Sequence, residues 1–199
     1  MAGELVLVIG GVRSGKSDYA LRLASSRTGR VTVLATGEAS DAEMRRRIDL
    51  HRRGRPKAWT TVEAPRDIGS PLRAAGPHDV LLLDDIGNLV TAHLREVVGD
   101  VDPEAIEAPP GADEKLDQGV RRDLEDLTSM VDNGDVGIVI AVANEVGMGV
   151  VPPTVLGRLF RDAMGRANQL LAQRATSVVF CMAGIPTIVK GDDPMKARG

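Results

Sequence analysis

Five short, nearly continuous apolar runs rich in Val, Leu, Ile and Ala recur along the chain and constrain its fold more than any other feature. Gly, Pro, Asp or Asn residues flank the runs, which are Leu5–Ile9, Val31–Ala35, Val80–Leu83, Val136–Val142 and Val178–Ala183. Apolar residues that do not alternate with polar ones are typical of strands buried on both faces. The runs therefore predict the central strands of a parallel sheet.

Between these runs, apolar residues recur every three or four positions, which predicts helices. The predicted helices span Lys16–Ser26, Asp41–Arg53, Asp113–Val131 and Thr154–Ala175. Strands that alternate with helices predict an α/β fold, in which a mostly parallel sheet is covered on both faces. A last short strand is expected over Thr187–Val189, because Pro186 suits a sheet edge.

Chain length predicts one domain. A chain of 199 residues is about one domain in size and buries enough surface to fold without a disulfide or a metal. We expect a single nucleotide-binding domain over residues 1–190 and a flexible tail over residues 191–199. Residues 99–113 are acidic, contain three Pro and show no periodicity, so we expect an exposed loop there.

Composition excludes several classes of protein. A net charge of −3 and only one Trp, one Tyr and two Phe argue against a nucleic-acid polymer as partner. The single cysteine, Cys181, excludes an internal disulfide and a Cys-rich metal site. No long apolar run or basic leader is present, so we expect neither a membrane span nor a signal peptide, and a cytoplasmic protein.

One glycine-rich segment directly follows the first predicted strand and precedes the first predicted helix. It reads GGVRSGKS and fits the pattern G-x-x-x-x-G-K-[ST] of a phosphate-binding loop. Glycines let backbone N–H groups face a phosphate chain, the lysine reaches the β- and γ-phosphates, and the serine hydroxyl can bind Mg²⁺. The predicted nucleoside triphosphate site comprises Gly10, Gly11, Val12, Arg13, Ser14, Gly15, Lys16 and Ser17.

Two carboxylates end the third predicted strand. Asp84 and Asp85 follow the run Val80–Leu83, an arrangement by which phosphate-binding-loop proteins hold Mg²⁺. Asp is also common at strand ends and helix caps, so the pattern alone leaves both roles open. We take Asp84 as the first candidate for binding Mg²⁺ (or Mn²⁺) and Asp85 as the second, with Ser17 as the other protein ligand.

His51 lies in a strongly basic segment. Residues 45–57 contain seven cations, and Asp49 is the only acid among them. One interpretation is a solvated helix face on which His51 is half-buried, in register with Met44 and Ile48. The other is that the cations bind a second phosphate group and that the imidazole attacks it, while guanidinium groups stabilise the transition state. The spacing alone does not decide between them.

Several motifs, taken in order, make the chain resemble one enzyme family. They are GGVRSGKS at 10–17, LATGEASDAEMRRRIDLHRRGRP at 34–56, LLLDD at 81–85, NEVGMGVVP at 144–152, FRD at 160–162 with GRANQ at 165–169, and AGIPTIVK at 183–190. This order resembles the bifunctional adenosylcobinamide kinase and adenosylcobinamide-phosphate guanylyltransferase of cobalamin biosynthesis over nearly the whole chain. NEVGMGVVP is more specific than the phosphate-binding loop, which many unrelated proteins carry.

The resemblance implies a three-layer RecA-like P-loop NTPase fold, a homotrimer and two reactions. In the first reaction, ATP or GTP phosphorylates the aminopropanol hydroxyl of adenosylcobinamide. In the second, GTP guanylylates a histidine and pyrophosphate leaves. The GMP then passes to adenosylcobinamide phosphate and gives adenosylcobinamide-GDP.

The resemblance also implies which residues carry these reactions. The family's histidine aligns with His51, so His51 and Lys16 are the expected catalytic residues. Besides the loop at 10–17, the expected nucleotide-binding residues are Ala35, Thr36, Arg52, Arg53, Gly54, Arg55, Glu63 and Asp84. We assign Asn144–Pro152, Arg161 and Arg166 to the active site or the corrinoid pocket. The alternative for Gly147, Met148 and Gly149 is a tight turn at a subunit contact.

Two positions depart from the family pattern. Leu50 precedes His51 where many relatives carry a second histidine, so His51 must act alone. Asp85 stands where we expect a neutral residue, which leaves the metal ligand ambiguous. Two other functions remain open: a single-function P-loop kinase for another small alcohol, which would not need His51, and a nucleotide-gated switch that docks a partner through residues 99–113.

Overall fold

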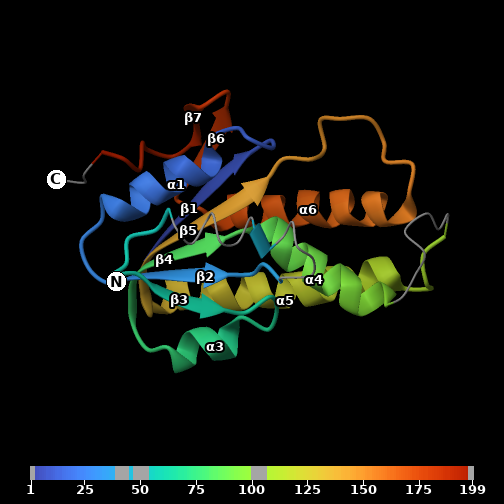
Figure 1. The fold of residues 1–199 in the computed structure, drawn as a ribbon, viewed down its shortest axis with the longest axis horizontal. Coiled ribbons are helices and arrows are strands. Elements are labelled where there is room, and N and C mark those ends of the chain that lie inside the picture. Colours follow the sequence, from blue (N-terminus) through green and yellow to red (C-terminus); the bar gives the residue numbers. More distant parts are fainter. Residues whose placement is uncertain (1–2, 39–44, 47–53, 100–106, 197–199) are drawn as a thin grey trace.

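A seven-stranded sheet forms the centre of the computed structural model, which describes residues 3–38, 45–46, 54–99 and 107–196. The strands follow the order β3-β2-β4-β5-β1-β6-β7 (Figure 1). They are β1 (Glu4–Gly10), β2 (Val31–Ala35), β3 (Thr60–Glu63), β4 (His78–Asp84), β5 (Val136–Asn144), β6 (Ser177–Met182) and β7 (Ile185–Lys190). The helices are α1 (Lys16–Ser25), α3 (Gly69–Ala74), α4 (Ile86–Val98), α5 (Ala112–Asn133) and α6 (Val155–Arg174).

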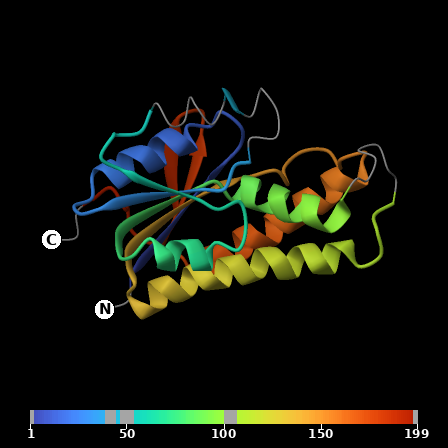
Figure 2. The ribbon, with the colours of Figure 1, turned by 60° about the horizontal axis from the view of Figure 1, so that its bottom comes forward.

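Helices cover both faces of the sheet. All neighbouring strands are parallel except β6 and β7, which form an antiparallel pair. Helix α1 lies on one face, and α3, α4, α5 and α6 lie on the other (Figure 2). The expected three-layer α/β fold with a mostly parallel sheet is confirmed.

Strand β1 shows why the predicted apolar runs are continuous. Successive side chains of a strand point to opposite faces of the sheet. Leu5 and Leu7 are buried in the cluster beneath α4, α5 and α6, whereas Val6 and Val8 are buried against α1 beside Leu23. A strand covered on both faces therefore carries apolar side chains at nearly every position.

The structure adds three elements that the sequence pattern did not delimit. Strand β3 has only four residues, and its side chains alternate between half-buried and exposed, which is typical of an edge strand rather than a buried one. Helix α3 has six residues, too few to show helical periodicity. Helix α4 begins directly after Asp85, which caps it.

The predicted helix over Asp41–Arg53 lies largely outside the described residues, of which Arg45 and Arg46 are helical. Of the loop expected over residues 99–113, residues 100–106 lie outside the described part of the chain. Gly99 ends α4, residues 107–111 precede α5, and Ala112 and Asp113 already belong to the first turn of α5 rather than to a loop. Among the helices that the structure describes, none is long and apolar enough to cross a membrane.

The beginning of the expected C-terminal tail contacts the rest of the molecule. Arg27 Nη2 donates a hydrogen bond to the carbonyl oxygen of Pro194 at 2.9 Å. Ser177 Oγ donates one to the carbonyl oxygen of Asp192, also at 2.9 Å. Residues 191–196 are therefore held against β6 and the end of α1, and residues 197–199 lie outside the described part of the chain.

Candidate active site

Strand register brings several expected nucleotide-binding residues to one edge of the sheet. At the carboxyl end of β2, Ala35 pairs with Glu63 of β3 on one side and with Asp84 of β4 on the other. At the end of β1, Gly10 pairs with Asn144 of β5 and with Cys181 of β6. Ligands of open α/β sheets bind outside the carboxyl ends of the strands. This edge is therefore the candidate site.

The phosphate-binding loop runs from the end of β1 to the start of α1. Gly15 precedes the helix with a φ of 89°, which residues with a side chain rarely adopt. Lys16 is only 7% exposed, and its Nζ donates a hydrogen bond to the carbonyl oxygen of Gly11 at 3.1 Å. The lysine thus lies back over the loop, where a phosphate would compete with that carbonyl group for its ammonium protons.

Two neighbouring segments hold the loop by backbone hydrogen bonds. The amide of Glu145 donates to the carbonyl oxygen of Gly10 at 3.0 Å, and the amide of Gly184 donates to that of Ser14 at 2.9 Å. Ser14 is buried, and its Oγ has no hydrogen-bond partner within the described residues. The loop is therefore fixed at its start by the segment after β5 and near its end by the turn between β6 and β7.

Asp84, the first candidate for the metal, binds an arginine. Arg55 Nη2 lies 2.7 Å from Asp84 Oδ2, and the two side chains are 8% and 13% exposed. Arg55 was expected to bind the nucleotide. The structure places it at the strand end, beside the carboxylate that was expected to hold Mg²⁺.

Asp85, the second candidate for the metal, has a structural role. Its Oδ1 accepts a hydrogen bond from the amide of Asn88 at 2.8 Å, which caps helix α4. Its backbone carbonyl oxygen accepts a hydrogen bond from Thr36 Oγ1 at 2.7 Å. Burial raises the pKa of Asp85, and the negative charge of Asp84 adds to this increase. These contacts identify Asp85 as a helix cap.

The segment after β5 begins at this edge of the sheet, where the amide of Glu145 binds the carbonyl oxygen of Gly10. Asn144 Nδ2 approaches Asp85 Oδ2 at 3.4 Å, and the backbone oxygen of Asn144 accepts a hydrogen bond from Asn168 Nδ2 at 3.0 Å. Further along, Met148 is 83% exposed and Val150 is 94% exposed. Sequence reasoning assigned this segment to the active site but did not find the Asn168–Asn144–Asp85 contacts, which have no local sequence signal.

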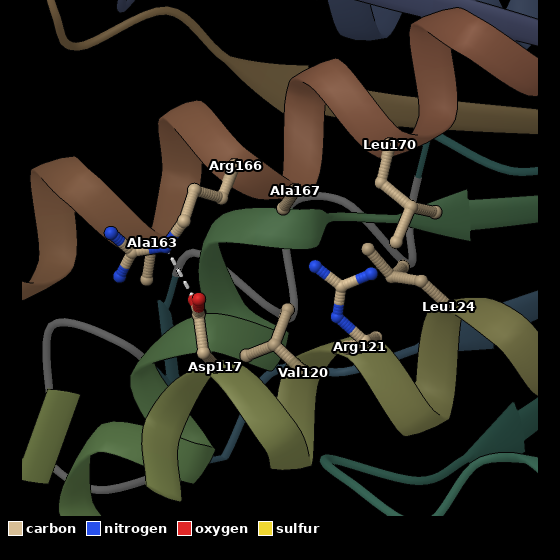
Figure 3. A pocket seen from close by; sticks show the side chains of 8 residues that line it. All are labelled: Asp117, Val120, Arg121, Leu124, Ala163, Arg166, Ala167 and Leu170. Atoms are coloured by element: carbon tan, nitrogen blue, oxygen red, sulfur yellow. Dashed lines mark hydrogen bonds and ion pairs between the residues drawn. The ribbon is translucent and has the colours of Figure 1, made fainter. Parts of the chain in front are cut away.

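Arg166 lies elsewhere. Its Nε donates to Asp117 Oδ1 of α5 at 2.6 Å, in a shallow groove between α5 and α6 (Figure 3). The ion pair joins two helices, and the assignment of Arg166 to the active site or the corrinoid pocket stays a prediction. Arg161 lies beside Asp162, with its Nε 3.3 Å from Oδ1.

The expected nucleophile lies outside the described residues, as do Arg52 and Arg53. Gly54 and Arg55 are the first described residues after His51, and Gly54 is exposed. In the described part of the chain, no three His, Cys, Asp or Glu side chains come together to form a metal site. Mg²⁺ at nucleotide sites is typically held by one or two protein ligands together with phosphate oxygens, and the hydroxyl of Ser17 and the carboxylate of Asp84 have that chemistry.

Comparison with known families and proteins gives a consistent match. A family model described as cobinamide kinase / cobinamide phosphate guanyltransferase matches residues 6–189. The bifunctional adenosylcobalamin biosynthesis protein CobU of Escherichia coli K12 is 36% identical over 187 residues, which are 94% of this chain and 99% of that protein. CobP of Pseudomonas aeruginosa PAO1, also named a bifunctional adenosylcobalamin biosynthesis protein, is 37% identical over 186 residues, 94% of this chain and 97% of that protein.

Solved structures share the fold at low sequence identity. A Pyrococcus horikoshii OT3 protein superposes with a TM-score of 0.51 at 10% identity, covering 96% of this chain and 88% of its own. An ATPase of the bacterial type III secretion system also superposes with a TM-score of 0.51, at 13% identity, covering 90% of this chain and 52% of its own. These similarities support the fold assignment alone.

Proposed function

The chain belongs to the cobinamide kinase / cobinamide phosphate guanyltransferase family, and we propose that both reactions use one nucleotide site at the carboxyl edge of the sheet. Membership makes it an enzyme of cobalamin biosynthesis, a kinase and a guanylyltransferase. It also favours the two-reaction function over a single-function kinase or a nucleotide-gated switch. The observation that carries the proposal is the Arg55–Asp84 contact, which ties the segment after His51 to that edge.

In the kinase reaction, the phosphate-binding loop holds the triphosphate of ATP or GTP. Its backbone amides and the ammonium group of Lys16 would neutralise charge on the phosphates as the γ-phosphoryl group passes to the aminopropanol hydroxyl of adenosylcobinamide. Ser17 and Asp84 would hold Mg²⁺, which supplies further charge neutralisation. Ala35, Thr36 and Glu63 line the same edge and are proposed to contact the nucleotide.

In the guanylyltransferase reaction, His51 acts as the nucleophile. An imidazole nitrogen attacks the α-phosphorus of GTP, the bond to the β-phosphate oxygen breaks, and pyrophosphate leaves. The proton of the other ring nitrogen is released, so that the intermediate is a neutral-ring phosphoramidate. A phosphate oxygen of adenosylcobinamide phosphate then attacks the same phosphorus, the P–N bond breaks, and His51 regains a proton. We propose that Arg52, Arg53, Gly54 and Arg55 steady the nucleotide in this reaction.

Labelling the protein with GTP tests this function. GTP labelled at the α-phosphate should leave label on the protein that survives alkali and is lost in acid, as a phosphoramidate does. His51→Ala should abolish the label while the protein still binds GTP. Absence of label on the wild-type protein, under conditions in which GTP demonstrably binds, would refute the guanylyltransferase step.

Two variants sharpen the labelling experiment. Lys57→Ala removes an exposed cation six residues after the nucleophile and should label like the wild type, which controls for a general loss of positive charge. Lys16→Met keeps the length of the side chain but removes its charge. It should reduce both phosphorylation of adenosylcobinamide and labelling by ~100-fold or more, because one preorganised donor at a reacting phosphate contributes on that order.

We also propose that the chain assembles as the homotrimer that the family resemblance implies. Met182, Ile185 and Val189 are 66–67% exposed at the β6–β7 end of the sheet, where an apolar edge strand needs a covering partner. The trimer is testable by light scattering after size exclusion. We expect the reactions to take place in the cytoplasm, where their nucleoside triphosphates are made.

A further inference from the structure

The motif AGIPTIVK forms the turn between β6 and β7 and the whole of β7. Met182 pairs with Ile185, so Ala183 and Gly184 form a two-residue hairpin loop. Both have positive φ values, 52° and 80°, as in the tight hairpin turns that favour Asn-Gly. Ala183 is an unusual residue for such a conformation. The turn thus has a defined geometry that its own sequence only partly favours.

This turn packs directly against the phosphate-binding loop. The amide of Gly184 donates to the carbonyl oxygen of Ser14 at 2.9 Å. A Cβ atom at Gly15 would lie 3.0 Å from Gly184 Cα, and one at Gly10 would clash with the carbonyl oxygen of Cys181. Gly10 and Gly15 are therefore needed so that β6 and the turn can approach the loop, independently of any bound phosphate.

The hydrogen bond from Gly184 also sets the direction of a donor within the loop. A trans peptide unit is planar, and its C=O and N–H bonds point in opposite directions. Because the carbonyl group of Ser14 points outward to Gly184, the amide of Gly15 in the same peptide unit points away from the hairpin. Amides of such a loop at a helix N-terminus are the groups that bind phosphate.

We propose that Gly184 is a positioning residue of the nucleotide site, which acts on the triphosphate through the Ser14–Gly15 peptide unit. The proposal rests on the proposed function of residues 10–17. Rotation of this peptide would turn the Gly15 amide away from the phosphates and direct the carbonyl oxygen of Ser14 toward them. The hairpin prevents that rotation before a nucleotide binds. The Gly15 amide is therefore already oriented in the folded protein, and binding does not have to supply the free energy of orienting it.

The test compares Gly184→Val with Gly76→Val. Gly76 has a φ of 85° and open space around it, and Gly184 likewise has a positive φ and open space. Gly76, however, lies between α3 and β4, at the amino ends of the parallel strands and therefore away from the nucleotide site. A β-branched residue is disfavoured at such φ values, so both variants should lose stability. Only Gly184→Val should weaken GTP binding, by about 3- to 10-fold, the net contribution of one hydrogen bond.

A spectroscopic measurement separates positioning from stability. In the wild-type protein, the Gly15 amide proton should shift downfield when GTP is added, because it donates to a charged oxygen. This shift should be much smaller in Gly184→Val and unchanged in Gly76→Val. Adding Ala183→Asn to Gly184→Val should restore part of the affinity, because Asn favours the positive φ of the turn. If Gly184→Val does not fold, Gly184→Ala is judged against Gly76→Ala by the same criteria.

The outcomes distinguish the two proposals. If the wild-type protein does not bind GTP, both the proposed function and the role of Gly184 are refuted. If the wild type binds GTP and the Gly184 variant binds equally well with the same Gly15 shift, only the role of Gly184 is refuted. An equal loss of affinity in the Gly76 variant would show that the effect arises from lowered stability, and would refute it as well.

Discussion

The guanidinium group of Arg55 and the carboxylate of Asp84 meet at 2.7 Å, with both side chains nearly buried. Their contact links the strand end expected to hold Mg²⁺ to the segment that follows the expected nucleophile. A carboxylate oxygen that accepts this charge-assisted hydrogen bond is less available to a cation. Arg55 and Mg²⁺ should therefore compete for Asp84, which argues against assigning Arg55 to the guanylyl reaction alone.

We predict that Arg55→Ala destabilises the protein and increases its response to Mg²⁺. Loss of a hydrogen bond to a charged group should lower the free energy of unfolding by about 1.5–3 kcal/mol. Mg²⁺, titrated without nucleotide, should then stabilise Arg55→Ala more than the wild type, because the cation no longer competes with the guanidinium group. Urea unfolding at several Mg²⁺ concentrations measures both effects.

Lys57→Ala is the matched control, since Lys57 is an exposed cation two residues away. Its unfolding free energy should stay within about 0.5 kcal/mol of the wild-type value, as for most exposed positions. An equal Mg²⁺ response in the wild type and in Arg55→Ala would show that Arg55 and Mg²⁺ do not compete for Asp84.

The strands buried on both faces were predictable because burial leaves a continuous apolar run at each. Strand β2 matches its predicted limits, Val31–Ala35, and β1 extends its run by one residue at each end. Strand β3 has no such run, because its Thr61 and Glu63 side chains are exposed. Its alternating pattern over four residues is too short to distinguish from a loop.

The phosphate-binding loop was predictable because its chemistry depends on residues adjacent in sequence. The contacts that position it were not, since they join distant segments: Gly184 lies 170 residues after Ser14. Arg166 gives a second example. The motif assigned it to the active site or the corrinoid pocket, and its contact with Asp117 of α5, 49 residues earlier in the chain, has no local sequence signal.

We predict that Asp85→Asn stabilises the protein at neutral pH in the absence of nucleotide and metal. Burial raises the pKa of Asp85 in the folded state, so stability associated with its protonated form is present at acidic pH. That stability is lost as the pH rises through the folded-state pKa. Asparagine stays neutral at every pH and can still cap α4 through its side-chain oxygen.

The stability of Asp85→Asn should therefore exceed that of the wild type near pH 7, and the difference should shrink as the pH falls. Urea unfolding between pH 4 and pH 7 measures it. Asp113→Asn, at an exposed carboxylate in the first turn of α5, should follow the wild-type pH dependence. A wild-type protein that is more stable than Asp85→Asn at pH 7 would contradict the prediction.

We predict that Asp123→Ala is among the most destabilising substitutions at a distance from the nucleotide site. Its buried carboxylate accepts hydrogen bonds from the amides of Asp67 and Ile68, and its Oδ2 lies 2.7 Å from His93 Nε2. Removal of a buried partner leaves such groups unsatisfied and costs about 3–5 kcal/mol.

Urea unfolding measures the loss, and GTP affinity below the unfolding transition should remain within about twofold of the wild-type value. Asp126→Ala removes a carboxylate from the same helix, where Asp126 lies 3.7 Å from the exposed Arg73 and beside Gly69 of α3. It should change the unfolding free energy by less than about 1 kcal/mol. Similar losses for Asp123→Ala and Asp126→Ala would show that the buried contacts do not stabilise the fold.

We predict that two sets of exposed apolar side chains have different functions: Met182, Ile185 and Val189 at the β6–β7 end of the sheet, and Met148 and Val150 in the segment after β5. Val189→Asp places a charge on β7, where we propose a subunit contact, and should shift the protein from trimer to monomer in light scattering.

Met148→Asp places the same charge in the segment after β5. This segment begins beside the nucleotide site, where the amide of Glu145 donates to the carbonyl oxygen of Gly10. It should leave the trimer intact and raise the KM for adenosylcobinamide about 10-fold, as expected when an apolar contact with a substrate is replaced by a charge. If Met148→Asp dissociates the trimer instead, this segment is the subunit contact and the corrinoid binds elsewhere.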